Sequence, residues 1–122
     1  MDESVYGTAS TNKRVLVVDD DEGLRNLIAR HLRKAGYDVA IAGNGAVAIG
    51  IARTEPGRLM VLDQKLADMT GREVIQRLTD LGCKAHFIMM TGQGDERLAV
   101  EMMKLGAADY LVKGLDLLDL LP

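Results

Sequence analysis

Short apolar runs alternate with longer amphipathic segments along most of this chain. Each run is apolar over about four or five residues and is bounded by charged or turn-forming residues, which is the pattern of a buried β-strand. The segments between the runs repeat apolar residues at intervals of three and four, the spacing of one helical face. The expected strands cover residues 15–18, 38–42, 59–62, 86–90 and 108–112.

Residues typical of helix ends flank the amphipathic segments. Asn44 can cap a helix over 45–55, and Thr70 with Glu73 fits a capping box. Glycine accepts the left-handed backbone of a C-terminal cap, and it stands where three of the helices should stop. The helices are therefore expected from Leu24 to Ala35 before Gly36, over 45–55, from Thr70 to Leu81 before Gly82, from the Asp95 cap to Gly106, and from Leu115 to Leu121.

The alternation of five strands with helices predicts an α/β domain with a parallel sheet and right-handed crossovers. A length of 122 residues fits one domain with a sizeable core. The first 12 residues are polar and acidic and are expected to form a flexible tail, which leaves residues 13–122 for the domain.

Composition narrows the class of protein. A hydrophobic content of 48% with 27% charged residues is ordinary for a globular chain, and a net charge of −3 gives no basic surface for nucleic acid or an anionic membrane. The single cysteine, Cys83, excludes an internal disulfide. No apolar run approaches the roughly 20 residues that cross a bilayer, and the first residues do not resemble a signal peptide. We therefore expect a cytoplasmic protein.

Polar side chains follow four of the five expected strands at the point where each strand ends. These residues are Asp19 and Asp20 after the first strand, Asp63 after the third, Thr91 after the fourth and Lys113 after the fifth. Because the carboxyl ends of parallel strands meet at one edge of a sheet, these side chains should share a crevice.

Such a crevice favours phosphoryl chemistry. Three carboxylates repel one another unless a cation compensates, and an all-oxygen ligand set suits Mg²⁺. The ammonium group of Lys113 and the hydroxyl group of Thr91 can both bind phosphoryl oxygens. The reaction class that follows is phosphoryl transfer onto an aspartate.

Four stretches of the chain resemble the receiver domain of bacterial two-component response regulators: VLVVDDDE, MVLDQKLADMTG, FIMMTG and GAADYLVKG. The resemblance implies a flavodoxin-like sheet with strand order 2-1-3-4-5. It also implies that Asp63 is the phosphoacceptor. Asp20, Asp63 and the backbone carbonyl of Lys65 would bind Mg²⁺ directly, and Asp19 would act through a metal-bound water.

The resemblance assigns further roles. Thr91 and Tyr110 would form the conformational switch, and Lys113 would pair with the phosphoryl group. The side chains of Lys65 and Gln93 would tune the phosphoryl lifetime. The implied donor is the phosphohistidine of a sensor histidine kinase or a phosphotransfer protein. The chain would thus be a signalling domain rather than an enzyme, although it would promote its own phosphorylation and slow dephosphorylation.

The resemblance also bears on what surrounds the domain. The last helix is shorter than in the family, which favours a receiver truncated within that helix, with an output domain beyond it, over a nearly stand-alone receiver. A homodimer through the fourth and fifth helices is a further partner that the resemblance allows.

Two positions depart from the family pattern. Ala67 stands where the family has proline, so this loop should be less rigid. Gly114 replaces a second proline, so the Lys113–Gly114 bond should be either trans or a strained cis bond, with Lys113 less firmly placed.

Several residues have simpler interpretations. Asp21 is expected to cap the first helix, and the methionines are expected to fill the core. The exposed face of the first helix should carry four basic residues: Arg25, Arg30, Arg33 and Lys34.

Two other functions are compatible with the sequence. One is a Mg²⁺-dependent phosphatase with Asp19 as the nucleophile of an Asp-x-Asp motif. The other is a receiver-like interaction module that is never phosphorylated, although such a module usually lacks one of the acidic or lysine residues that this chain retains.

Overall fold

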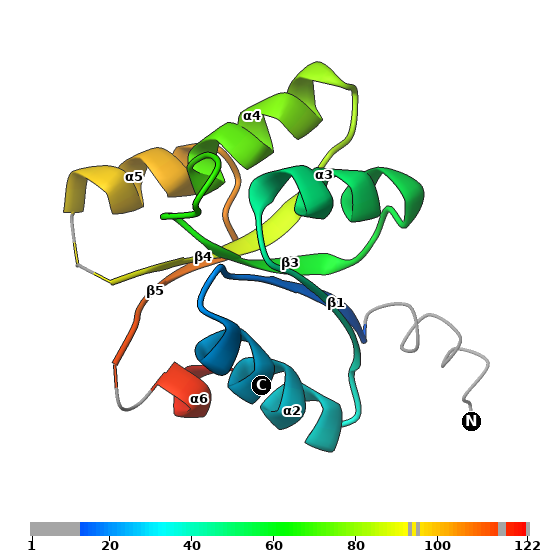
Figure 1. Cartoon of the computed structure of the whole chain (residues 1–122). Helices are drawn as coiled ribbons and strands as arrows, with labels where there is room; N and C mark the ends of the chain where they lie inside the picture. The colour runs from blue at the N-terminus through cyan, green and yellow to red at the C-terminus, as the bar shows by residue number, and fades with distance from the viewer. Residues whose placement is uncertain (1–12, 93, 95, 115–116, 122) are drawn as a thin grey trace, which may run out of the picture.

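The computed structural model describes residues 13–92, 94, 96–114 and 117–121 (Figure 1). The expected tail over 1–12, the Asp95 cap, Gln93 and the first residues of the last helix lie outside this part of the chain. All five expected strands are present, each within one residue of its predicted bounds. In order, the elements are β1 (Arg14–Val18), α2 (Glu22–Lys34), β2 (Asp38–Ala42), α3 (Gly45–Thr54), β3 (Leu59–Asp63), α4 (Gly71–Asp80), β4 (His86–Thr91), α5 (Glu96–Lys104), β5 (Asp109–Val112) and α6 (Leu117–Leu120).

The five strands form one parallel sheet in the order β2-β1-β3-β4-β5, which confirms the predicted order. β3 occupies the middle of the sheet and is apolar until its last residue, Asp63. Val18 of β1 pairs in register with Leu62, and Asp63 pairs with Met90 of β4. The central position of β3 therefore delivers one carboxylate to the middle of the carboxyl edge.

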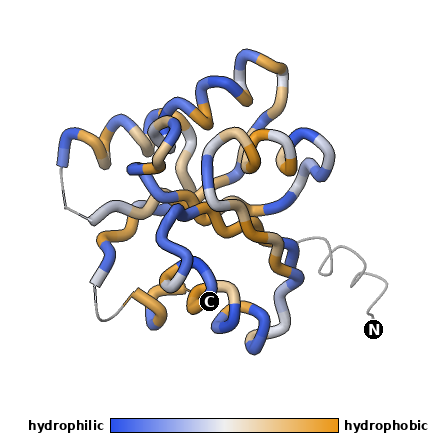
Figure 2. The backbone as a smooth tube through the Cα atoms, in the orientation of Figure 1, coloured by the Kyte–Doolittle hydropathy of each residue, from blue (hydrophilic) through white to orange (hydrophobic). Residues whose placement is uncertain are grey.

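Helices cover both faces of the sheet. α3, α4 and α5 lie on one face and α2 and α6 on the other (Figure 1). The tube in Figure 2 is hydrophobic along the strands, whereas the helices alternate in hydropathy, as expected for helices with one buried face. This arrangement gives two cores, one on each side of the sheet.

The methionines only partly follow the prediction that they fill the core. Met60, Met89 and Met102 are buried beneath α3, α4 and α5, and Met90 is buried on the opposite face. Met103, in contrast, is 52% exposed on α5. Its neighbour in sequence takes the inward position on the helix, so Met103 points to solvent.

The predicted caps that fall within the described residues are present. Asn44 Oδ1 accepts a hydrogen bond from the Val47 N–H group at 2.9 Å. Thr70 and Glu73 form a reciprocal capping box at the start of α4. The three glycines expected to stop helices adopt positive φ values: Gly36, Gly82 and Gly106. Local sequence chemistry thus sets where these helices begin and end.

The last helix is short, as predicted. A helix of about two turns was expected from Leu115; its first two residues lie outside the described part of the chain, and the described helix α6 covers Leu117–Leu120. Leu117 and Leu121 are nonetheless buried against the core below the sheet. Within the described residues, none of the helices has the length and apolar character needed to cross a membrane.

Candidate functional site

The carboxyl ends of β1, β3 and β5 bring two acids and a lysine together. Asp63 is the last residue of β3 and is 4% exposed, and Asp19, directly after β1, is 0% exposed. Lys113 directly follows β5. Parallel pairing places the three residues at one edge of the sheet, as the sequence predicted.

The ammonium group of Lys113 lies between the two buried carboxylates. Its Nζ atom is 2.9 Å from Asp19 Oδ2 and 3.2 Å from Asp63 Oδ2. The Lys113 N–H group donates a hydrogen bond to the Thr91 carbonyl at 2.7 Å. The described residues contain no cis peptide bond, so the Lys113–Gly114 bond is trans. Pairing with β4 therefore holds this backbone although proline does not follow the lysine.

The electrostatics of the site reflect an excess of negative charge. Burial, together with repulsion from Asp19, raises the pKa of Asp63 to about 6, although Lys113 acts in the opposite direction. Burial also opposes the charged form of Lys113. The hydrogen bond and charge of Asp19, together with the charge of Asp63, outweigh this effect and raise the lysine pKa.

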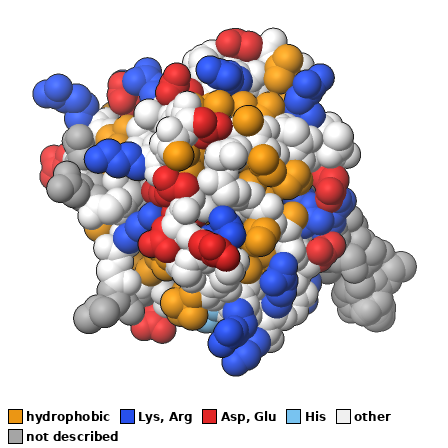
Figure 3. Space-filling view, viewed as in Figure 1, with side chains coloured by type: hydrophobic (Ala, Val, Ile, Leu, Met, Phe, Trp, Pro, Cys, Tyr) orange, Lys and Arg blue, Asp and Glu red, His pale blue; other side chains and the backbone are white. Residues whose placement is uncertain are grey.

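Three carboxylates could hold a metal ion. Oxygen atoms from Asp19, Asp20 and Asp63 all lie within 4.8 Å of one another. Asp19 Oδ2 is buried and forms an ion pair of 2.9 Å with the Lys113 ammonium group. On the side of the molecule that Figure 3 shows, acidic side chains gather near the middle, with basic side chains beside them. These oxygens fit a hard divalent cation.

Asp21 does not belong to this cluster. Its side chain accepts a hydrogen bond from the Leu24 N–H group at 3.1 Å and so caps α2, as predicted. Its own N–H group donates to Asp19 Oδ1 at 2.9 Å. Asp21 thus starts the helix and fixes the orientation of the neighbouring acid.

Arg25 was wrongly assigned to the exposed face of α2, whereas Arg30, Arg33 and Lys34 are exposed as expected. Arg25 is half-buried, its NH1 atom lies 3.5 Å from the Asp19 carbonyl oxygen, and its Nε atom is buried without a hydrogen-bond partner. Its position in the first turn, close to the acidic ends of the strands, was the one available signal.

The loop after β3 carries the side chain of Lys65 into solvent. The Lys65 N–H group lies 3.5 Å from Asp63 Oδ1. Lys65 also forms an isolated antiparallel bridge with Thr70. A peptide group of the loop therefore lies close to the Asp63 carboxylate.

The two expected switch residues lie on neighbouring strands. Thr91 ends β4 and is buried. Tyr110 on β5 is half-buried, and its hydroxyl group is buried without a hydrogen-bond partner. Gln93, expected to tune phosphoryl lifetime, lies outside the described residues.

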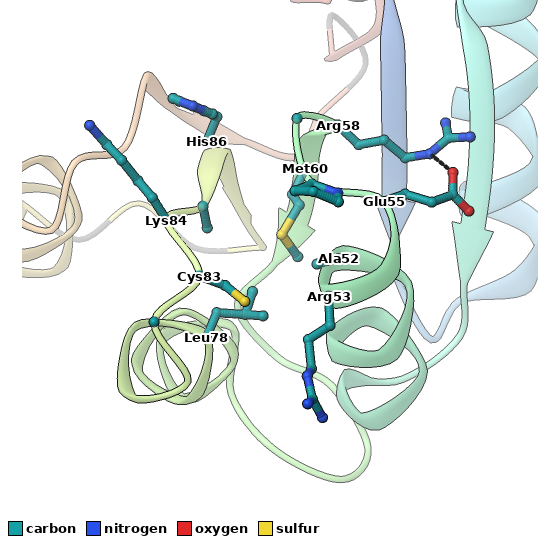
Figure 4. Close-up of a pocket in the computed structure, with 13 residues that line it drawn as sticks. Ala52, Arg53, Glu55, Arg58, Met60, Leu78, Cys83, Lys84 and His86 are labelled. Carbon is teal, nitrogen blue, oxygen red and sulfur yellow. Dashed lines mark hydrogen bonds and ion pairs between the residues drawn. The ribbon is translucent and has the colours of Figure 1, made fainter.

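A hollow of about 490 Å³ lies at the opposite edge of the sheet, where β3 and β4 begin (Figure 4). None of the predicted site residues lines it. Met60 and Leu78 on its floor are almost inaccessible to solvent, and an ion pair of 2.7 Å between Arg58 and Glu55 closes one side. The carboxyl edge, which brings the acids and the lysine together, is therefore the candidate functional site rather than this hollow.

Comparisons with known proteins agree with one another. A family described as "Response regulator receiver domain" matches residues 15–122. The acid tolerance regulatory protein ActR of Rhizobium meliloti is 37% identical over 110 residues, which make up 90% of this chain and 57% of that protein. The chain thus spans little more than half the length of this relative.

Solved structures give the same result. The signal receiver domain of a putative Luxo repressor protein from Vibrio parahaemolyticus superposes with a TM-score of 0.82 at 31% identity, covering 89% of this chain and 83% of that one. A second similar structure is that of a response regulator protein from Burkholderia pseudomallei with a phosphorylated aspartic acid, a calcium ion and citrate. It superposes with a TM-score of 0.77 at 33% identity, covering 89% of this chain and 64% of that one.

Proposed function

The chain belongs to the response regulator receiver family, and we propose that Asp63 accepts a phosphoryl group from a phosphohistidine. The observation that carries this proposal is the position of Asp63, buried at the end of the central strand with its carboxylate 3.2 Å from the Lys113 ammonium. The donor would be a sensor histidine kinase or a phosphotransfer protein. The structure from Burkholderia pseudomallei supports the chemistry, because it contains a phosphorylated aspartate in the same fold.

The transfer reaction is a displacement at phosphorus. A carboxylate oxygen of Asp63 forms a bond to phosphorus while the bond from phosphorus to the imidazole nitrogen of the donor breaks, and the electron pair of that bond returns to the imidazole. The Asp63 carboxylate must be ionised to attack, which its pKa of about 6 permits at neutral pH. Lys113 would pair with a phosphoryl oxygen as negative charge moves to the site.

A divalent cation, Mg²⁺ in our proposal, would neutralise the phosphoryl oxygens when bound. Asp20, Asp63 and the Lys65 carbonyl would hold it, and Asp19 would assist through a water molecule. The close approach of the three carboxylate groups supports this assignment. The exposed side chain of Lys65 would affect the access of water to the phosphoryl group.

Phosphorylation would then change the conformation of the domain. The new phosphoryl oxygens would attract the Thr91 hydroxyl group, and Tyr110 would move toward the space that Thr91 leaves. The buried hydroxyl group of Tyr110 supports this step, because an unsatisfied buried hydroxyl costs about 1–3 kcal/mol and favours a rearrangement that gives it a partner.

The proposed context is a cytoplasmic two-component pathway. Because the chain matches only 57% of the ActR protein, we propose that an output domain follows this receiver. Direct contact with nucleic acid or a membrane is not part of the proposal. A second copy of the chain is a further candidate partner, since Val100 and Met103 expose apolar side chains on α5.

Phosphodonor labelling tests the proposal. The protein is incubated with Mg²⁺ and acetyl phosphate, and its intact mass is measured for the wild type, Asp63→Asn and Asp19→Asn. We expect the wild type to gain one phosphoryl group and Asp63→Asn to gain none. Beryllofluoride binding, followed by NMR, provides a second readout that does not depend on phosphoryl lifetime.

The two other functions predict different results. An adduct that survives in Asp63→Asn but is lost in Asp19→Asn would indicate the Asp-x-Asp phosphatase. The cap that Asp21 forms on α2 argues against it, because the second acid of that motif is already engaged. A wild type that responds to neither acetyl phosphate nor beryllofluoride would indicate the interaction module.

A further inference from the structure

The N-terminus of α3 is capped by a residue from a different loop as well as by its own N-cap. Asp68, in the loop between β3 and α4, accepts a hydrogen bond from the Gly45 N–H group at 2.8 Å through Oδ1. It accepts a second from the Ala46 N–H group at 3.0 Å through Oδ2. The local cap, Asn44, accepts from Val47. The first three N–H groups of the helix are therefore satisfied by two side chains far apart in the sequence.

The residue after Asp68 reinforces the same contact. Met69 packs so closely against Gly45 that a Cβ atom on this glycine would lie 2.5 Å from Met69 Cγ. Two successive loop residues thus rest on the first turn of α3, one through hydrogen bonds and one through packing. The loop is attached to α3 as well as to its own flanking elements.

This attachment lies opposite the part of the loop that faces the phosphoacceptor. Lys65 and Thr70 pair across the loop, and the Leu66 N–H group donates to the Met69 carbonyl at 3.2 Å. The segment therefore folds back on itself, and a displacement of 68–69 would be transmitted to the peptide of Lys65. Ala67 has no ring to restrict its φ angle, so these contacts replace the local rigidity of proline.

We propose that Asp68 is a positioning residue, which holds the loop after Asp63 against α3 and so places the Lys65 carbonyl for the metal ion. The inference rests on the proposed function, since it assumes that this carbonyl binds Mg²⁺. The charge of Asp68 suits the role, because a carboxylate is favoured at the positive end of a helix. The hydrogen bonds from Gly45 and Ala46 also lower its pKa, so it remains ionised at neutral pH.

A comparison of two capping variants tests the proposal. Asp68→Ala and Asn44→Ala each remove a cap from the same end of α3, but only Asp68→Ala releases the loop. Both variants should lower the Tm. Only Asp68→Ala should weaken Mg²⁺ binding in calorimetric titration, by about tenfold, the lower end of the loss seen when a group that orients a metal ligand is removed.

Hydrogen exchange provides a readout that needs no metal. The Leu66 amide should exchange faster in Asp68→Ala than in the wild type and should be unchanged in Asn44→Ala. Asp68→Asn keeps one acceptor oxygen and should give a Leu66 exchange rate and a Mg²⁺ affinity between those of the wild type and Asp68→Ala. It replaces Asp68→Ala in the comparison if that variant does not fold. Equal Mg²⁺ affinity and equal Leu66 exchange in the two alanine variants would overturn the inference.

The design also separates this inference from the proposed function. A wild type that binds no Mg²⁺ and forms no adduct at Asp63 would overturn the proposed function and, with it, the role of Asp68 toward the metal. A wild type that binds Mg²⁺, with Asp68→Ala and Asn44→Ala equally affected, would overturn only the positioning role.

Discussion

The Lys113 ammonium lies 3.2 Å from the Asp63 carboxylate, although β4 separates the strands that carry the two residues. The same ammonium lies 2.9 Å from the buried carboxylate of Asp19. One lysine thus faces two buried acids, and burial, together with repulsion from Asp19, raises the pKa of Asp63. These three residues carry one more negative than positive charge, an imbalance that a cation or a proton can relieve.

The first prediction concerns the pH dependence of stability. Because folding raises the pKa of Asp63 from 3.8 to about 6, the protonated acid is favoured in the folded state. The contribution of this pKa shift to the stability of the folded state is fully present below pH 3.8 and is lost as the pH rises through 6. Without Mg²⁺, Asp63→Asn should therefore be more stable than the wild type at pH 8 by about 1–2 kcal/mol, allowing for solvent screening.

The measurement is urea unfolding in the presence of a chelator at pH 4 and at pH 8. The two proteins should have nearly the same free energy of unfolding at pH 4. A difference that is the same at both pH values would show that the substitution acts through packing rather than through the charge of Asp63.

The second prediction concerns Lys113. Replacing it with methionine leaves Asp19 and Asp63 without their cation. Without Mg²⁺, we expect the free energy of unfolding to fall by about 2–3 kcal/mol at pH 7.5. This is less than the 3–5 kcal/mol typical of a broken buried ion pair, because Asp63 can take up a proton. Mg²⁺ should restore more stability to this variant than it adds to the wild type. Lys84→Met, at an exposed lysine, should change stability by less than about 0.5 kcal/mol.

The third prediction compares two glycines. A Cβ atom at Gly71 would lie 2.7 Å from the backbone oxygen of Asp63, which cannot move without displacing the phosphoacceptor. Gly71→Ala should lower the free energy of unfolding by about 1–3 kcal/mol and reduce adduct formation with acetyl phosphate. Gly50, within α3, has no atom within 4 Å of such a Cβ, so Gly50→Ala should stabilise the protein by about 0.5–1 kcal/mol. Similar free energies of unfolding for the two variants would contradict this steric argument.

The fourth prediction tests the capping box of α4. The Thr70 hydroxyl group accepts from the Glu73 N–H group at 3.1 Å, so Thr70→Ala should lower the free energy of unfolding by about 1 kcal/mol. Thr54→Ala, near the exposed end of α3, removes a hydroxyl group that only bonds back to helix carbonyls and should have little effect. Thermal unfolding of the two variants, side by side, is the measurement. Equal changes in Tm would mean that the loss of a threonine, and not of the cap, accounts for the effect.

Much of the fold could be predicted because its signals are local. Apolar runs such as 59–62 gave the strands, and Asn44, Asp21 and the pair Thr70–Glu73 gave helix starts, since each depends on residues within four positions. The strand order came from the family resemblance rather than from these patterns. The exposed side chain of Met103 was not predicted, because its position depends on how the whole helix packs.

The sequence by itself determined that acids, a hydroxyl group and a lysine follow strands that end at the same edge, because parallel pairing brings carboxyl ends together. Only the tertiary structure decided the contacts within that edge: Lys113 between two acids, Arg25 beside the Asp19 carbonyl, and Asp68 on the first turn of α3. Each of these contacts depends on side-chain rotamers and on distances between elements to within about 1 Å. No pattern of neighbouring residues encodes such distances, since they arise only when the whole core is packed.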